Sequence, residues 1–394
     1  MMKKISLKIT VMLLAFSAGV AIASIFYFDR STAAPVPEPE LEIEQPPLNA
    51  GSKTLEIVFV LDTTGSMGGL LEGAKQKIWG IVNEVMQKKS KPNVRVGLVA
   101  YRDRGDIYET QILPVTEDLD KVYSKLMEFQ AAGGGDHPEN VRKALADGVK
   151  NAGWSKAKGG VAQIVFLVGD APPQNYRNEP DVLATADFAV KQNMIVNTIQ
   201  CGTHSDTIRI WNQIAQHGQG KYFAIAQDGG VEVINTPYDE EISQLGRKIG
   251  SSYMAYGSKA EQAAKTADVE TTELSVANAA PSTARADRAL NKALNSEAYG
   301  GDFIQEIENG RVKLESVKAD ELPVELQKMS APERRAEVDK RLTERKKVRE
   351  QIIELAKKRA EYVEAERKKT GKQNGFDAAV GIALSEQLAK NGIE

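Results

Sequence analysis

The sequence predicts an α/β fold with a doubly wound, mainly parallel sheet of six strands, followed by a mainly helical carboxyl-terminal region. From Leu55 to about Ala260, apolar runs rich in β-branched residues alternate with stretches of helical spacing, which indicates successive βαβ units. Residues 57–61 and 164–168 are continuous apolar runs, typical of central parallel strands covered on both faces. After Tyr256 the composition shifts, which marks the start of a different region.

We expect strands near residues 55–61, 94–101, 109–113, 161–168, 194–200 and 221–226, with helices between them. The helix after the first strand carries an apolar stripe at helical spacing, formed by Leu70, Leu71, Ala74, Ile78, Ile81, Val82 and Val85. Core packing accounts for this stripe, so we assign it no further role.

The composition excludes several kinds of site. The 394 residues carry a formal net charge of -3, which gives no general attraction to nucleic acid, so we expect no specific nucleic-acid partner. Cys201 is the one cysteine, so neither an internal disulfide nor a cysteine zinc cluster can form. The three histidines, His137, His204 and His217, lack the spacing of a metal motif such as H-E-x-x-H, and we interpret them as solvated or locally hydrogen-bonded.

Residues 1–30 are predicted to be an amino-terminal signal anchor. Lysines precede an uncharged run over residues 9–28, which is long enough to cross a bilayer as one helix. Ala21 and Ala23 also offer a cleavage site, so a cleaved signal peptide stays open as the alternative. In either case the remainder is exported, and we expect it in a bacterial periplasm or envelope, anchored in the inner membrane. Residues 31–53 are rich in proline and glutamate and are predicted to be a semi-rigid linker.

The end of the first predicted strand carries the candidate functional residues. The strand ends in Asp62, and Thr64 and Ser66 follow at every second position. A turn at the carboxyl end of a strand brings such oxygen ligands to one point, which suits a hard divalent cation. The stretch Asp62-Thr63-Thr64-Gly65-Ser66 resembles the D-x-[ST]-x-S signature of von Willebrand factor A (VWA) domains. In that family the signature forms a metal-ion-dependent adhesion site, or MIDAS.

Two stretches downstream resemble the same family in the same order. Residues 133–139, GGGDHPE, stand where the family usually has a Gly-Gly-Thr turn that opens a helix. Asp170, just after the predicted strand 161–168, matches the family's last metal-coordinating aspartate. The sequence of residues 96–106, VGLVAYRDRGD, is similar to that of bacterial A-type domains.

The resemblance implies a bacterial-type VWA domain over residues 54–257 that binds Mg²⁺, or alternatively Mn²⁺ or Ca²⁺. The implied metal ligands are Asp62, Thr64, Ser66, Asp136 and Asp170. A cation is also reasonable physically, because clustered carboxylates without one repel each other and raise their own pKa values. The resemblance further implies that strand 94–101 runs antiparallel in the edge region of the sheet.

Asp136 departs from the threonine that is common in the family. Direct coordination would add a third carboxylate, so the cation would act mainly as a structural clamp. If Asp136 instead caps the helix expected to begin near Pro138, an acidic group from a partner remains an attractive ligand. The run of glycines at 133–135 lets the backbone bring this side chain close, so we favour direct or water-bridged coordination.

The implied function is recognition of a protein or cell-surface ligand, through an acidic residue of that partner, and we expect no enzymatic activity. An envelope scaffold with a structural metal is one alternative, and a Mg²⁺-dependent hydrolase is another. Against the hydrolase, Thr64 stands where a dehalogenase-type phosphatase needs its second carboxylate, and the turn around Ser66 does not form G-x-S-x-G. The sequence also lacks a phosphate-binding P-loop motif.

The remaining chain is predicted to comprise an Ala/Ser/Thr-rich linker with helical patches, 258–300, and a mainly helical region, 301–394. Residues 302–323 suggest a short packed piece with a strand or two. The stretch Ser330 to Glu333 is a capping box that starts a long helix. We interpret the Lys- and Arg-rich face of that helix as solvated, with binding to anionic lipid, cell wall or RNA as the alternative. Residues 376–393 predict a last amphipathic helix that folds back onto its neighbour.

Overall fold

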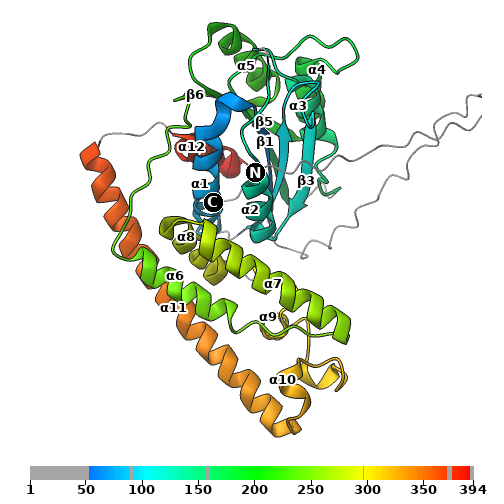
Figure 1. Cartoon of the computed structure of the whole chain (residues 1–394), viewed down its shortest axis with the longest axis vertical. Helices are drawn as coiled ribbons and strands as arrows, with labels where there is room; N and C mark the ends of the chain where they lie inside the picture. The colour runs from blue at the N-terminus through cyan, green and yellow to red at the C-terminus, as the bar shows by residue number, and fades with distance from the viewer. Residues whose placement is uncertain are drawn as a thin grey trace, which may run out of the picture. The chain divides into compact units, whose positions relative to one another are not determined.

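The computed structural model describes residues 53–88, 92–135, 137–156, 160–295, 297–370 and 375–390. The predicted signal anchor and nearly all of the proline-rich linker lie outside these residues. Six strands form one sheet in the order β3-β2-β1-β4-β5-β6 (Figure 1). Their bounds are β1 Thr54–Asp62, β2 Asn93–Tyr101, β3 Thr110–Thr116, β4 Val161–Gly169, β5 Met194–Cys201 and β6 Gln219–Ile225. The predicted six-stranded, mainly parallel α/β sheet is confirmed.

The direction of β2 differs from the expectation. β2 pairs parallel with β1, and β3 is the antiparallel edge strand. The connections explain this, because α1, Gly68–Met86, returns the chain across the sheet before β2 begins, whereas only the short stretch 102–109 joins β2 to β3. The expectation of an antiparallel strand 94–101 is therefore wrong, and the antiparallel strand is the next one.

Helices cover both faces of the sheet, which is why the central strands are apolar without alternation. Phe59 and Phe166 lie on the face covered by α1, by α2 (Leu119–Glu128) and by α12 (Phe376–Lys390). Val58 and Val165 lie on the opposite face, under α3 (Val141–Lys150), α4 (Val182–Lys191) and α5 (Ser205–His217). All nine residues of β1 are buried, so this strand is the centre of the domain.

The region after β6 is helical. The helices are α6 Asp239–Gly250, α7 Lys259–Ala279, α8 Ser282–Leu294, α9 Phe303–Glu308, α10 Val324–Gln327 and α11 Ala331–Thr370, and the 3-10 turns are η1 Gly65–Met67 and η2 Leu314–Ser316. Residues 258–300, expected to be a linker, therefore form two helices, and α8 packs against α1 and α6. The strand expected within 302–323 is wrong as well, because α9 and η2 occupy this stretch and Asp302 makes only an isolated bridge to Ala255.

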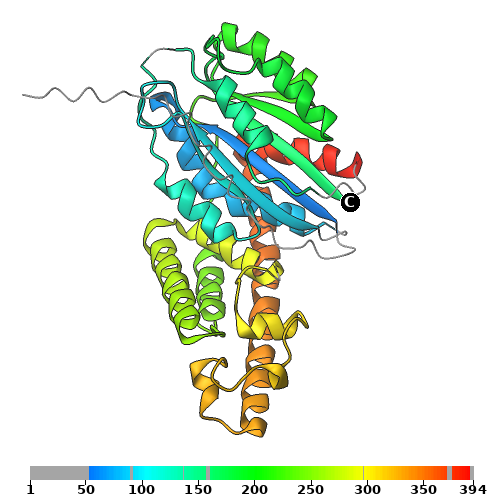
Figure 2. The same cartoon turned by 90° about the vertical axis from the view of Figure 1, so that its right-hand side faces the viewer.

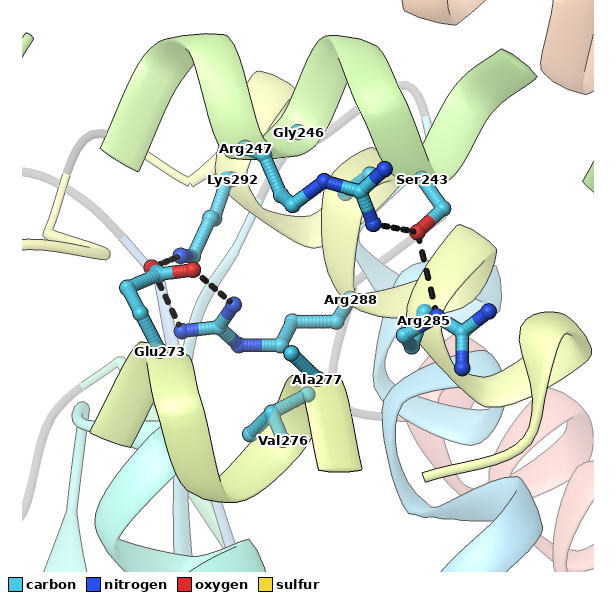
Figure 3. Close-up of a pocket in the computed structure, with 10 residues that line it drawn as sticks. Ser243, Gly246, Arg247, Glu273, Val276, Ala277, Arg285, Arg288 and Lys292 are labelled. Carbon is cyan, nitrogen blue, oxygen red and sulfur yellow. Dashed lines mark hydrogen bonds and ion pairs between the residues drawn. The ribbon is translucent and has the colours of Figure 1, made fainter. Parts of the chain in front are cut away.

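A buried ionic cluster joins these helices to the sheet domain. Arg288 of α8 donates to Asp120 of α2 and also contacts Glu273 of α7, with its Nη2 3.0 Å from Glu273 Oε1. Figure 3 shows the Glu273 carboxylate between Arg288 and Lys292. Burial alone would raise the pKa of Glu273, but the charges of Lys292 and Arg288 lower it to about 2. The cluster therefore holds α7 and α8 to α2 through charges that are largely shielded from water.

The long helix α11 differs from the solvated basic helix that we expected. Figure 2 shows it as the longest helix of the chain, running beside the other carboxyl-terminal helices. Arg345 is 2% exposed, and it binds the Asp302 carboxylate and Ser252. Arg359 bridges Asp239 and Asp287. The lysines near these arginines are exposed as expected. The arginines instead bind carboxylates of other helices and loops, so α11 is packed into the helical region through these ion pairs.

The last helix, α12, does not fold back onto α11 as predicted. It packs on the sheet instead, where Phe376 contacts Phe59 with 5.8 Å between ring centroids. Gln387 and Asn197 of β5 exchange two side-chain hydrogen bonds, of 2.7 and 3.0 Å. The amphipathic pattern was correct, and the apolar side of α12 packs mainly against α1 and also against the sheet face near β5 and β6.

Among the described residues, no helix is both long enough and apolar enough to cross a membrane. The run at residues 9–28, on which the anchor prediction rests, lies outside that part of the chain. The signal anchor and the domain boundaries at residues 30, 53, 257 and 300 remain predictions.

Candidate metal centre

Three loops at the carboxyl ends of β1 and β4 and before α3 meet at one edge of the sheet. Backbone hydrogen bonds join the loop after β1 to the segment before α3, because Gly65 N donates to Gly133 O and Ala132 N donates to Thr63 O. Glu139 N donates to Pro172 O, which ties the segment before α3 to the loop after β4. The sequence-predicted residues of the first and last loops are therefore brought to the same place.

Asp62 is fully buried at the end of β1. Its Oδ1 accepts hydrogen bonds from Thr64 N at 2.8 Å and from Thr64 Oγ1 at 2.6 Å. Its Oδ2 is buried, and no described residue supplies it with a hydrogen-bond partner. Burial raises the pKa of Asp62 from 3.8 to about 7, the Thr64 hydrogen bonds oppose this, and the charge of Asp170 adds to it. A buried carboxylate oxygen without a partner is costly, so it is a natural place for a positive charge.

Glu139 is a second carboxylate of the same kind, and the sequence analysis did not select it. The residue is 3% exposed, and its buried Oε2 has no hydrogen-bond partner in the part of the chain that the structure describes. Burial, followed by the charges of Asp62, Asp103, Asp106 and Asp170, raises its pKa to about 9. Glu139 is the last residue of the GGGDHPE stretch, and the glycines before it are the sequence signal that points to it.

The glycine turn brings Glu139 close to the first loop. Gly133 and Gly134 have φ angles of +78° and +76°, a left-handed conformation that favours glycine. A Cβ atom on Gly134 would lie 2.5 Å from Glu139 Oε1 and 2.7 Å from the Cβ of Thr64. Only a residue without a side chain leaves this space, so Gly134 allows Glu139 and Thr64 to approach the same point.

The other predicted ligands in the described part of the chain differ in how exposed they are. Thr64 is buried and its Oγ1 lies 3.4 Å from Ser66 Oγ, while Ser66 itself is exposed. Asp170 is 7% exposed, and its Oδ2 accepts a 2.6 Å hydrogen bond from Gln227 Nε2. Gln227 lies just after β6, so a third strand end contributes to the site. Ser66 is the predicted ligand most open to a partner molecule.

Asp136 lies outside the described residues, so its predicted role as a ligand remains a prediction. In the alternative, Asp136 was to cap a helix beginning near Pro138, and no helix begins there. α3 begins at Val141, and the Asn140 side chain accepts a hydrogen bond from Lys143 N as its cap. The backbone of Glu139 is drawn into a bridge with Pro173, which keeps this segment extended before the helix starts.

The donor types suit a hard divalent cation, although the carboxylates of Asp62, Glu139 and Asp170 do not form a group whose ligand oxygens all lie within 4.8 Å of one another. Asp62, Glu139 and Asp170 supply carboxylate oxygens, Thr64 and Ser66 supply hydroxyls, and such oxygen ligands favour Mg²⁺, Mn²⁺ or Ca²⁺. A cation would stabilise the ionised forms of Asp62 and Glu139, whose pKa values are raised without one. The residues that would hold it are therefore the predicted Asp62, Thr64, Ser66 and Asp170, together with Glu139.

Comparison with known proteins finds similarity over the sheet domain. The family model described as von Willebrand factor A domain matches residues 56–237. VWA domain-containing protein 7 of Mus musculus is 40% identical over 212 residues, which are 49% of this chain and 20% of that protein. The protein of the same name from Rattus norvegicus is 29% identical over 212 residues, with the same shares. The chain thus spans about a fifth of the length of these relatives.

A solved structure is also similar in part. The structure titled conserved hypothetical protein BatB, from Bacteroides thetaiotaomicron, is 18% identical, with a TM-score of 0.33. The similarity covers 44% of this chain and 90% of that one.

Proposed function

We propose that the von Willebrand factor A domain formed by residues 56–237 is a cation-dependent protein-binding module with a MIDAS-type site. One observation carries the proposal: Asp62 and Glu139, both buried at the sheet edge, each hold a carboxylate oxygen for which the described residues supply no hydrogen-bond partner. A divalent cation bound at this edge would offset the charge of both carboxylates, and the exposed Ser66 would leave the cation accessible from outside.

The surface beside the site suits a protein partner. Asp106 Oδ2 accepts a hydrogen bond from Gly134 N, which places the 103–108 loop next to the glycine turn. Ile107 in this loop is 91% exposed. An aliphatic side chain beside a cation offers a partner both an apolar contact and a ligand position, and we expect that position to take an acidic residue.

The proposal includes recognition without catalysis. The Thr64 hydroxyl donates its hydrogen bond to Asp62. This hydroxyl is therefore held by a carboxylate that would bind the cation, and we expect it not to act as a nucleophile. Hydrolysis of a generic phosphatase substrate, assayed with and without Mg²⁺, should show no activity above background. Mg²⁺-dependent turnover that Asp62→Asn abolishes would favour the hydrolase alternative instead.

The proposed location is a bacterial envelope, with an anchor in the inner membrane and the domain outside the cytoplasm. It rests on the uncharged run at residues 9–28 and the lysines before it. An anchored protein keeps its first residues and stays with the membrane in a carbonate wash. A soluble mature form beginning at Ser24 would contradict the anchor.

The binding function is tested with full-length protein immobilised and exposed to an envelope extract in Mg²⁺ or in EDTA. We expect proteins that are retained in Mg²⁺, released by EDTA and absent with Asp62→Asn. The matched control is Asp320→Asn, which removes a carboxylate from an exposed position in the helical region. Capture that neither EDTA nor Asp62→Asn reduces would refute the proposal and favour a scaffold whose helices make the contacts.

A further inference from the structure

Two histidines and an aspartate lie together outside the site described above. His137 precedes α3, His204 is the residue before α5, and Asp206 lies in the first turn of α5. The ligand atoms of these three side chains all lie within 4.8 Å of one another. His137 Nε2 is 3.3 Å from Asp206 Oδ2, and the two imidazole rings are 4.5 Å apart between centroids.

Hydrogen bonds at the start of α5 hold His204 and Asp206 in place. Asp206 Oδ1 accepts a hydrogen bond from Thr207 N at 2.9 Å, and Oδ2 is the oxygen that faces His137. The carbonyl of His204 accepts from Gln200 Nε2 and from Ile208 N, while its imidazole makes no capping hydrogen bond to α5. These bonds fix the backbone at His204 and Asp206, and the imidazole rings of His137 and His204 are tilted by 41° to each other, with the Asp206 carboxylate beside His137.

We propose that His137, His204 and Asp206 form a binding site for a divalent transition-metal ion of the Zn²⁺ class. Two imidazole nitrogens and one carboxylate oxygen are ligands that Zn²⁺ prefers, and three protein ligands leave a position for water or for a partner's side chain. The oxygen-only donor set around Asp62 favours Mg²⁺ instead. The chain therefore offers two sites of different metal preference on one edge.

The two sites are neighbours but separable. Thr207 Oγ1, next to Asp206, donates to the carbonyl of Asp170 at 3.0 Å, so the start of α5 contacts the loop of the first site. No ligand of the histidine site is shared with the Asp62 site. The inference is therefore independent of the proposed binding function, and Asp62→Asn should leave Zn²⁺ binding at the histidines intact.

The chain contains a matched control for these histidines. His217 Nδ1 lies 2.8 Å from Asp187 Oδ1, and both side chains are as exposed as those of the cluster. Within the described part of the chain, His217 belongs to no group of three such ligands. A histidine paired with one carboxylate tests whether any exposed His-Asp pair would give the same signal.

The test is calorimetric titration of Zn²⁺ into full-length protein without a polyhistidine tag, in excess Mg²⁺ to occupy the oxygen site. We expect one Zn²⁺ per chain, with affinity lowered at least about tenfold in His137→Ala and in His204→Ala and unchanged in His217→Ala. Co²⁺ in place of Zn²⁺ should give visible absorption bands in the wild type and in Asp62→Asn, and lose them in His204→Ala. Since all three ligands are exposed, thermal unfolding should confirm that the variants fold.

Absence of Zn²⁺ binding in the wild type would overturn the inference. Binding that persists unchanged in both histidine variants, or that disappears with Asp62→Asn, would place the ion elsewhere and overturn it as well.

Discussion

Asp62→Asn should stabilise the cation-free protein at alkaline pH while abolishing its response to Mg²⁺. Asn keeps the oxygen that accepts from Thr64 and removes the charge from a residue that is fully buried. Burial raises the pKa of Asp62 from 3.8 to about 7, and each pH unit corresponds to about 1.36 kcal/mol. Ionised Asp62 therefore lowers the free energy of unfolding of the wild type by up to about 4 kcal/mol. The gain in Asp62→Asn is smaller by the cost of burying the new amide nitrogen without an acceptor.

The sign of the pH dependence follows from the raised pKa. Between pH 3.8 and about 7 the folded protein holds a proton on Asp62 that the unfolded chain has released, so stability falls as the pH rises through this window. Above it the full cost is present. Asp62→Asn does not lose stability in this way. The free energies of unfolding of wild type and variant should therefore move further apart between about pH 5 and pH 8.

Urea unfolding in EDTA at pH 5 and pH 8 measures the divergence, and repeating it in Mg²⁺ measures the cation's effect. We expect a gap that widens by about 2 to 3 kcal/mol between the two pH values in EDTA. Mg²⁺ at about a hundred times its dissociation constant should stabilise the wild type by about 2.7 kcal/mol and the variant not at all. A gap in EDTA that is the same at both pH values, with Asp320→Asn behaving like wild type, would show that Asp62 ionises without cost and refute the reasoning.

Three further predictions address other residues. Glu139→Gln should lower Mg²⁺ affinity at least about tenfold in calorimetry, because it removes a charge that faces the cation; unchanged affinity would place Glu139 outside the site. Arg288→Ala should cost about 3–5 kcal/mol in urea unfolding, because it removes the guanidinium from Asp120 and Glu273 and leaves Lys292 as the cation facing both buried carboxylates; a cost below about 1 kcal/mol would contradict the buried cluster. Phe376→Ala should cost about 3–5 kcal/mol because it empties the contact with the sheet, whereas Ile382→Ala, at a half-exposed position of the same helix, should cost under about 1 kcal/mol. Equal losses in the two α12 variants would mean that the helix is not docked as described.

The sheet could be predicted from the sequence because local pattern and tertiary environment agree there. β1 and β4 are apolar along most of their length, and both are buried between two layers of helices. The direction of β2 could not be predicted in the same way, since a strand has the same residues whichever way its neighbour runs. Chain connectivity decides it, and the resemblance assigned the antiparallel direction one strand too early.

The place of the candidate ligands could be predicted from the sequence where they stand beside a strand end. Asp62 and Asp170 follow apolar strands directly, and this pattern identified them. Glu139 is brought in by a left-handed glycine turn and by a bridge to Pro173. The glycine run signals a turn without saying which later side chain the turn delivers, and the bridge has no local sequence signature. The partners of Arg345 were missed for a similar reason, because a buried arginine on a helix looks like a solvated one until its carboxylate, here Asp302, is known.

The docking of α12 bears on how the chain acquires its structure during synthesis. The sheet strands end at Ile225, yet the face around Phe59 is closed by a helix that begins at Phe376. A ribosome therefore completes every strand long before it delivers the helix that covers them, and the nascent sheet keeps an apolar face open in the meantime. A recombinant fragment cut at residue 257 would reproduce that interim state permanently. Adding the α12 sequence as a separate peptide should then improve the fragment's solubility, as complementation of a missing element.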